Sequence, residues 1–354
     1  MTKLTSFALD LIRLFAAMIV FIGHLSGQRF TGGLFWQVGE LMDEAVIIFF
    51  VLSGFVISYV VSEKELLFRD YLIARAARMY SVALPAIFLT YTLDRFGIFI
   101  SPDLYNSSWG YLDAFDLSAV VSGFTFTNQL WYRDIHMGSM LPYWSLGYEV
   151  WYYIIFGAIF FARSVQWYIV GVLAILIAGP KIIVLFPLWL IGYFAYKFSL
   201  QLSRSSETRS NIALIMIASS FIGFVFYVVF ARKGFNIEMP KFISRPTLVR
   251  DYSLGLIFSL LLVGISNLQE LKGKAIGRFQ VYIKWLAGAT FSIYLLHMPI
   301  AQFLIAIVPP DANIPMRALV LLFTTMLLIL LIAEFTERKK HLYARFFSHV
   351  FRRW

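Results

Sequence analysis

The chain has 354 residues, of which 60% are hydrophobic and only 14% are charged, and its mean hydropathy is +0.76. Soluble domains are closer to half apolar and a quarter charged, so this composition excludes an ordinary soluble protein. The net charge of +10 would suggest a nucleic-acid partner in a soluble protein, but in a membrane protein it reflects Lys and Arg in cytoplasmic loops. Because cysteine is absent, disulfides and thiolate metal sites are excluded.

Apolar runs of about 20 residues, the length that crosses a hydrocarbon core, recur along the whole chain. The predicted full spans, about ten in number, lie near 7–27, 41–61, 80–98, 143–161, 166–180, 182–198, 211–230, 248–266, 285–307 and 317–336. Lipid cannot satisfy open strand edges, so the spans must be helices. The sequence therefore predicts an all-α, polytopic transmembrane helical bundle. The stretch 115–130 is shorter and more polar, and we interpret it as a re-entrant or interfacial helix.

The first apolar stretch contains Asp10 and Arg13 and lacks a small-residue cleavage site, so we interpret it as a retained span rather than a signal peptide. An even number of spans puts both termini on one side, and the larger share of Lys and Arg falls on that side, which we therefore take as the cytoplasm. The loop 231–250 is the exception, with Arg232, Lys233, Lys241, Arg245 and Arg250 outside. We divide the chain into a transmembrane domain, 1–340, and a basic cytoplasmic tail, 341–354.

The first span carries Asp10, Arg13 and His24, and ionisable groups inside a membrane span need a reason. Asp10 and Arg13 are neighbours on a helix, and Arg13 and His24 share one face because their spacing is close to three whole turns. Each residue alone could be ordinary, as a pair at a helix end or an interfacial imidazole. Their alignment on one face favours a functional site. With an unperturbed pKa of about 6.5, His24 can accept a proton at neutral pH, as a general base does.

The next polar features allow an ordinary interpretation as well as a functional one. Ser53 and Gly54, in the run Phe49–Phe55, are small enough for close helix packing, which is the interpretation we keep. Arg75 and Arg78 can point the same way from one helical turn and could bind phosphate, although ordinary positive charge on the cytoplasmic side explains them too.

Two later spans also carry polar groups at membrane depth. Trp144 and Glu149 open the span at 143–161, where an aromatic belt explains the Trp but not the Glu. Glu149 could orient His24 or contact sugar hydroxyls, and the aromatic rings could hold a sugar. His297 lies mid-way in the span at 285–307, three residues after Tyr294, as a structural histidine or as part of a site. Phosphate-loop, zinc-protease and nucleophile-elbow patterns are absent from the sequence, and no metal site is predicted.

These pieces, in this order and over essentially the whole chain, resemble acyltransferase family 3, the membrane acyltransferases that acylate bacterial surface polysaccharides. Five blocks carry the resemblance: Arg13 with His24, Phe49–Phe55, Arg75 with Arg78, Trp144-Ser145-Leu146 with Glu149, and Tyr294 with His297. The chain departs from the family where an acidic residue often precedes Phe49, because Val46–Ile48 stand there and Asp43 and Glu44 lie further back.

The resemblance implies roles for these residues. His24 would be the catalytic base or a transient acyl carrier, and Arg13, partnered by Asp10, would face the pantetheine arm or the thioester. Arg75 and Arg78 would hold the phosphates of acyl-CoA, and Glu149 belongs to the same predicted catalytic set. Trp144, Tyr294 and His297 would contact the substrate.

The resemblance further implies an O-acyltransferase, with acetyl as the expected acyl group, in the bacterial cytoplasmic (inner) membrane. Acyl-CoA would be a co-substrate rather than a tightly bound cofactor, and the acceptor would be a surface polysaccharide such as lipopolysaccharide, or a lipid-linked glycan. Besides the bilayer, no partner protein and no nucleic acid is expected. The alternative is a transporter or flippase of a lipid-linked sugar, but such proteins commonly have repeated halves, which this sequence does not show.

Overall fold

The predicted all-α architecture is confirmed, since every regular element is a helix in the part of the chain that the computed structural model describes. The structure describes residues 1–65, 67–105, 116–204, 209–232, 245–268, 276–308 and 314–351. They form two compact units. Unit 1 comprises Met1–Ala16, Asp43–Leu66 and Gly179–Ala287, and unit 2 comprises Ala17–Met42, Leu67–Ala178 and Gly288–Trp354.

The described residues include 8 helical segments that are long and apolar enough to cross a membrane. They match eight of the predicted spans, and they make the protein a multi-pass membrane protein. The predicted spans 143–161 and 166–180 correspond to α7 (Tyr143–Phe160), which is rich in Trp and Tyr, and α8 (Val165–Ala178), which is shorter. The stretch near 115–130 holds only α6 (Leu117–Phe124). At 1.5 Å per residue α6 is about 12 Å long, too short to span.

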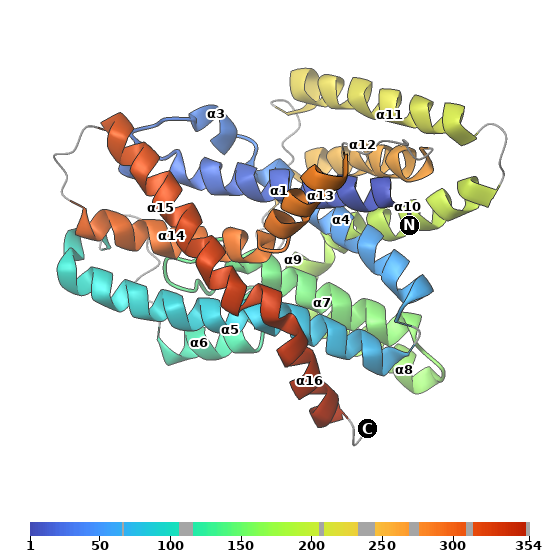
Figure 1. Cartoon of the computed structure of the whole chain (residues 1–354). Coiled ribbons are helices and arrows are strands. Elements are labelled where there is room, and N and C mark those ends of the chain that lie inside the picture. Colours follow the sequence, from blue (N-terminus) through green and yellow to red (C-terminus); the bar gives the residue numbers. More distant parts are fainter. Residues whose placement is uncertain are drawn as a thin grey trace. The chain divides into compact units, whose positions relative to one another are not determined.

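Unit 1 packs its helices around a core that includes Leu9, Phe55 and Tyr196. Its helices are the first part of α1 (Lys3–Leu25), then α4 (Met42–Glu63), α9 (Pro180–Ile183), α10 (Phe186–Arg204), α11 (Arg209–Phe226), η2 (Tyr227–Ala231), α12 (Leu248–Asn267) and α13 (Ile276–Ala287). The helix α12 lies between α10 and α11 and packs on both (Figure 1).

The small residues of α4 allow a close crossing with α10, which agrees with the packing interpretation. A Cβ atom on Gly54 would lie 1.9 Å from the Trp189 carbonyl oxygen, and one on Gly192 would lie 1.8 Å from the Val51 carbonyl oxygen. The Ser53 hydroxyl accepts a hydrogen bond of 3.2 Å from the Trp189 indole N–H. The two backbones are therefore nearly in contact, and neither helix has room for a side chain at the crossing.

Replacing Gly54 or Gly192 with alanine is expected to lower the thermal unfolding midpoint, because the helices must separate and overpacking costs about 1–3 kcal/mol or more. Gly223→Ala is the matched control, since the nearest atoms to its Cβ belong to the Ile257 side chain, at 3.2 Å and beyond, and not to a neighbouring backbone. Alanine favours a helix over glycine by about 1 kcal/mol, so the control variant should be neutral or more stable. Equal midpoints for Gly54→Ala and Gly223→Ala would contradict this account of the crossing.

Unit 2 is organised around the long helix α5 (Phe68–Ile100), on which α14 (Thr290–Ile307) and α16 (Lys340–Val350) both pack (Figure 1). Its other elements are the end of α1, α2 (Gln28–Thr31), α3 (Trp36–Gly39), η1 (Pro102–Leu104), α6, α7, α8, α15 (Ile314–Phe335) and η3 (Glu337–Lys339). α15 packs on α14, and α7 packs on α8.

The predicted basic tail is a helix over most of its length. In α16 the Phe347 ring lies 5.6 Å from the Tyr80 ring of α5, and Arg69 donates a hydrogen bond of 3.4 Å to the Ser348 carbonyl. Residues 352–354 of the tail lie outside the described residues, as do residues 233–244 of the predicted outer loop 231–250 and residue 115 of the stretch 115–130.

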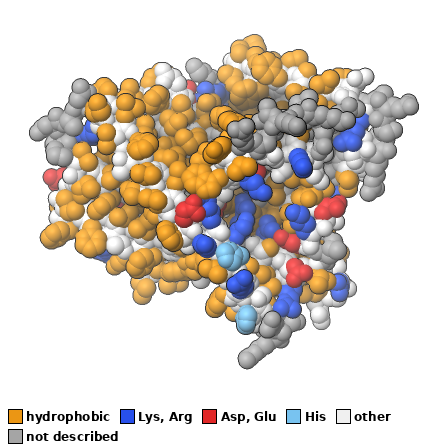
Figure 2. All heavy atoms as spheres, viewed as in Figure 1, with side chains coloured by type: hydrophobic (Ala, Val, Ile, Leu, Met, Phe, Trp, Pro, Cys, Tyr) orange, Lys and Arg blue, Asp and Glu red, His pale blue; other side chains and the backbone are white. Residues whose placement is uncertain are grey.

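Apolar side chains cover large parts of the visible surface (Figure 2). The exposed set includes Phe88, Phe99, Phe323 and Phe335, each of which is at least 71% exposed. Exposed apolar area of this extent is costly in water and favourable against lipid, so the surface is that of a membrane-embedded protein.

Candidate active site

His24 and His297 meet in unit 2. His24 is half-buried in the last turn of α1, whereas His297 is completely buried in α14. Their ring centroids are 5.1 Å apart, and His24 Nδ1 lies 3.2 Å from His297 Nε2. Phe21, one turn before His24, packs its ring edge-on against His297 at 6.0 Å. The structure thus joins the histidine of the first span to the late histidine of the sequence.

The hydrogen bonds of the pair determine which nitrogen of each neutral ring carries the proton. His297 Nδ1 lies 2.8 Å from the Ile293 carbonyl, which can only accept, so Nδ1 is the protonated nitrogen and Nε2 is an acceptor. His24 Nδ1 faces this acceptor and the Val20 carbonyl at 3.0 Å, so it must be the donor. The lone pair of His24 therefore resides on Nε2, as required of a general base that acts through that atom.

Tyr294 and Trp144, both predicted to bind substrate, lie on helices that the structure connects. The Tyr294 hydroxyl is 2.8 Å from the Ser145 hydroxyl, and both residues are buried, so this bond joins α14 to the start of α7. Trp144 is half-buried, and its ring packs edge-on against Tyr148 at 5.3 Å. The bond to Ser145 fixes the position of the Tyr294 ring one turn before His297.

Arg75, Arg78 and Glu149 gather around the buried side chain of Tyr153. The Arg75 guanidinium lies 5.6 Å from the centroids of both the Tyr71 and the Tyr153 rings, a cation–π arrangement. The Tyr153 hydroxyl donates to the Glu149 carboxylate, and the charges of Glu149, Arg78 and Arg75 all act on it. The structure therefore places Glu149 in one cluster with the two arginines.

Arg78 offers a buried donor to a ligand. Its guanidinium lies 4.6 Å from the centroid of the Phe291 ring, and its Nε is buried with no hydrogen-bond partner among the described residues. A buried N–H that is left unsatisfied costs free energy, and an anion such as phosphate would satisfy it. The chemistry of Arg78 is therefore suited to an anionic ligand such as a phosphate.

Glu337 of η3 holds the first turn of α14. Its carboxylate accepts hydrogen bonds from the Ser292 N–H at 2.9 Å, the Ser292 hydroxyl at 3.0 Å and the Phe291 N–H at 3.3 Å. A carboxylate is stabilised at this end of a helix by the unpaired N–H groups and the helix dipole. This contact fixes the start of α14, the helix that carries Tyr294 and His297.

Asp10 and Arg13 are paired in unit 1, as their spacing predicts. Arg13 Nη1 lies 3.8 Å from Asp10 Oδ1, and Lys284 of α13 also acts electrostatically on Asp10. α1 is one continuous helix from Lys3 to Leu25 and is long and apolar enough to cross a membrane, so the position of the predicted first span agrees with the structure.

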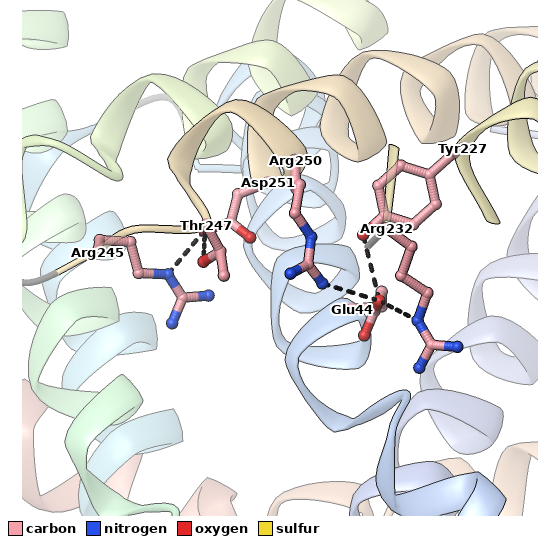
Figure 3. Close-up of polar contacts among 7 residues, drawn as sticks. All are labelled: Glu44, Tyr227, Arg232, Arg245, Thr247, Arg250 and Asp251. Atoms are coloured by element: carbon pink, nitrogen blue, oxygen red, sulfur yellow. Dashed lines mark hydrogen bonds and ion pairs between the residues drawn. The ribbon is translucent and has the colours of Figure 1, made fainter. Parts of the chain in front are cut away.

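Sequence reasoning missed a buried ion-pair network in unit 1 (Figure 3). Glu44 Oε1, at the start of α4, lies 3.1 Å from Arg232 Nε, 3.2 Å from the Tyr227 hydroxyl and 3.8 Å from Arg250 Nη2. Beside it, Arg245 Nε donates to Asp251 at 2.7 Å. The π-helical turn η2 contains Tyr227 and directly precedes Arg232. Three of the arginines that depart from the charge rule, Arg232, Arg245 and Arg250, are thus paired with buried carboxylates.

A second set of buried polar side chains that sequence reasoning missed lies in unit 2, on α5 and on the segments next to it. Asp94 is buried and accepts hydrogen bonds from the Ser139 N–H and hydroxyl at 2.9 and 2.6 Å. Arg29 donates to the Leu104 carbonyl, which Gln302 also contacts at 3.0 Å. Burial raises the pKa of Tyr105 and lowers the pKa of Arg29. Asp94 could have been found from the sequence, because it is an acidic residue inside the predicted span 80–98.

Among the described residues there is no group of three or more His, Asp or Glu side chains that could hold a metal ion. Comparison with known proteins gave one family: a model described as an acyltransferase domain matches residues 6–334. Neither curated proteins nor solved structures gave a match.

Proposed function

This chain belongs to the acyltransferase family whose model matches residues 6–334, and from that premise we propose that it is a membrane O-acyltransferase. The acyl group, which we take to be acetyl, would move from cytoplasmic acyl-CoA to a hydroxyl of a surface polysaccharide or lipid-linked glycan. We place the protein in the bacterial cytoplasmic membrane with both termini in the cytoplasm, following the charge distribution of its loops.

The observation that carries this proposal is the fixed tautomer of His24. The acceptor hydroxyl attacks the thioester carbonyl carbon while its proton passes to His24 Nε2. The new C–O ester bond forms, the C–S bond breaks, and the proton then passes from His24 to the coenzyme sulfur. As His24 becomes protonated, its Nδ1–H still donates to His297 Nε2, so His297 is a positioning residue that holds the imidazole.

An acyl-carrier role for His24 would use the same nitrogen. The acyl group would first pass to Nε2 with release of the coenzyme thiol, and the acceptor hydroxyl would then take it from the imidazole. Rapid quenching with labelled donor distinguishes the two mechanisms, since only the carrier mechanism leaves label on His24.

The remaining site residues have proposed roles in binding. Arg75 and Arg78 hold the phosphates of the donor, and Glu149 keeps Tyr153 and the arginines in place. Trp144 and Tyr294 contact the sugar. Asp10 keeps Arg13 oriented toward the pantetheine arm or the thioester, a role that rests on the family resemblance and on their ion pair.

The function is tested with radiolabelled acetyl-CoA, a surface-glycan fraction and the purified protein in detergent. Transfer of label to the glycan supports the proposal. In vesicles, movement of a lipid-linked glycan without acylation would instead establish the flippase alternative. The acceptor is identified by mass spectrometry of surface glycans from cells with and without the gene.

Replacing Arg75 and Arg78 together with alanine is expected to raise the KM for acyl-CoA by at least about tenfold, because charge-assisted hydrogen bonds contribute about 1.5–3 kcal/mol each. Arg95→Ala is the matched control, since Arg95 lies on the same helix about 25 Å away and contacts the Tyr91 ring. An unchanged KM for acyl-CoA in the double variant would remove both arginines from the donor site.

A further inference from the structure

Unit 1 contains a pocket of about 300 Å³ at the end where α1 and α11 begin. Six hydroxyl residues and one arginine are among the residues that line it: Thr2, Thr5, Tyr196, Ser199, Ser203, Ser266 and Arg209. This volume is at the lower end of the range of about 300–1,000 Å³ for ligand pockets. It suits a head group or a phosphate ester better than a whole coenzyme.

Arg209 is held in one orientation by a completely buried amide. Its Nε donates to Asn267 Oδ1 at 3.1 Å, and Asn267 Nδ2 donates to the Ser199 hydroxyl and the Val263 carbonyl, both at 2.9 Å. The Nε edge of the guanidinium is thus engaged, and the two Nη atoms are the part that can serve a ligand. A guanidinium oriented in this way loses little conformational entropy when it binds an oxyanion.

The polar groups around Arg209 favour an anion. Ser266 Oγ is buried and has no hydrogen-bond partner among the described residues, so it can donate to a ligand. Ser199 accepts from Asn267 and keeps its own O–H for donation. Among the described side chains that line the pocket, Arg209 is the only charged one, and none is a carboxylate.

The helix ends near the pocket do not set its charge by themselves. α1 and α11 begin there, whereas α10 and α12 end there, at Arg204 and Asn267. The positive and negative ends of the four helix dipoles offset one another, so Arg209 is the charged side chain of the pocket that can attract an anion.

We propose that this pocket binds a phosphate group, carried either by an anionic phospholipid or by the acyl-donor coenzyme. Arg209 would contact the phosphate oxygens through its Nη atoms, and Ser199 and Ser266 would donate hydrogen bonds to the same group. The phospholipid source is independent of the proposed function, whereas the coenzyme source rests on the proposed use of acyl-CoA and concerns a phosphate contact in addition to those of Arg75 and Arg78.

The test measures binding to the purified full chain in detergent, with two probe pairs that each differ in phosphate. Dioctanoyl phosphatidylglycerol is compared with dioctanoylglycerol, and coenzyme A is compared with pantetheine. We expect at least one phosphate-bearing probe to bind more tightly than its phosphate-free partner, and Arg209→Gln to weaken that binding at least tenfold. The probe that responds identifies the source of the phosphate.

Two further variants keep the test decisive. Arg163→Gln removes the same charge from an exposed loop position and should leave both affinities unchanged. Ser203→Phe fills the pocket while keeping Arg209, so it should weaken binding even if Arg209→Gln does not fold. The proposal would be overturned if the affinities for both phosphate probes change less than twofold in Arg209→Gln. If only Ser203→Phe folds, the same result in that variant would overturn it.

Discussion

Replacing His24 with alanine is expected to lower the rate of acyl transfer by about 10²–10⁴-fold, the usual contribution of a positioned general base. The protein should still insert and accumulate, because His24 is only half-buried and lies at the end of α1. The measurement is label transfer from acetyl-CoA to the glycan, with the amount of membrane-inserted protein determined in parallel. His341→Ala, at an exposed position of α16, should keep full activity. Undiminished transfer by His24→Ala would exclude His24 from the chemistry.

Variants of His297, assayed for acyl transfer in the same way, distinguish a positioning role of this residue from a merely structural one. In His297→Ala the Nδ1–H of His24 loses its acceptor at 3.2 Å and keeps only the Val20 carbonyl at 3.0 Å, so the ring is held less firmly and its protonated form is less well stabilised. The kcat should fall and the pH profile should shift, with little change in the KM for the donor. His297→Gln, whose side-chain amide can accept at the same place, should recover part of the activity. A pH profile of His297→Ala identical to that of the unmodified protein would contradict this role.

Replacing Glu44 with glutamine is expected to lower the free energy of unfolding by about 3–5 kcal/mol, the penalty for removing one partner of a buried ion pair. The Glu44 side chain is 6% exposed and faces Arg232 and Arg250, whose positive charges would lose their shared counter-charge (Figure 3). Glutamine keeps the size of the side chain, so the loss measures the charge rather than a cavity. The unfolding midpoint in detergent provides the measurement.

Glu63→Gln is the control for this result, because Glu63 is exposed at the other end of the same helix. An ion pair of an exposed carboxylate contributes only about 0–1 kcal/mol to the free energy of unfolding. If both variants unfold at the same midpoint, the Glu44 network does not stabilise unit 1. The network also explains why so much positive charge is tolerated on the side predicted to be outer, since buried carboxylates pair with Arg232, Arg245 and Arg250.

Local periodicity was sufficient for much of the fold. Runs of apolar residues predict spans because the bilayer requires a fixed length of apolar helix, and eight of these spans coincide with long apolar helices. The spacing of Asp10 and Arg13 predicts their ion pair because three residues nearly complete a helical turn. The stretch 115–130 was predicted not to be a full span because it is short and polar, and the structure has only the short helix α6 there. These features depend only on neighbours along the chain.

The contacts that define the candidate site depend on residues far apart in sequence, which periodicity cannot relate. His24 meets His297, Ser145 meets Tyr294, and Glu44 meets Arg232 only because their helices pack together. The sequence by itself determined that this is a helical membrane protein with an ionisable first span and the motifs of an acyltransferase. Only the tertiary structure decided that His297 Nε2 is a further acceptor for the Nδ1–H of His24, because helix packing brings the two rings together.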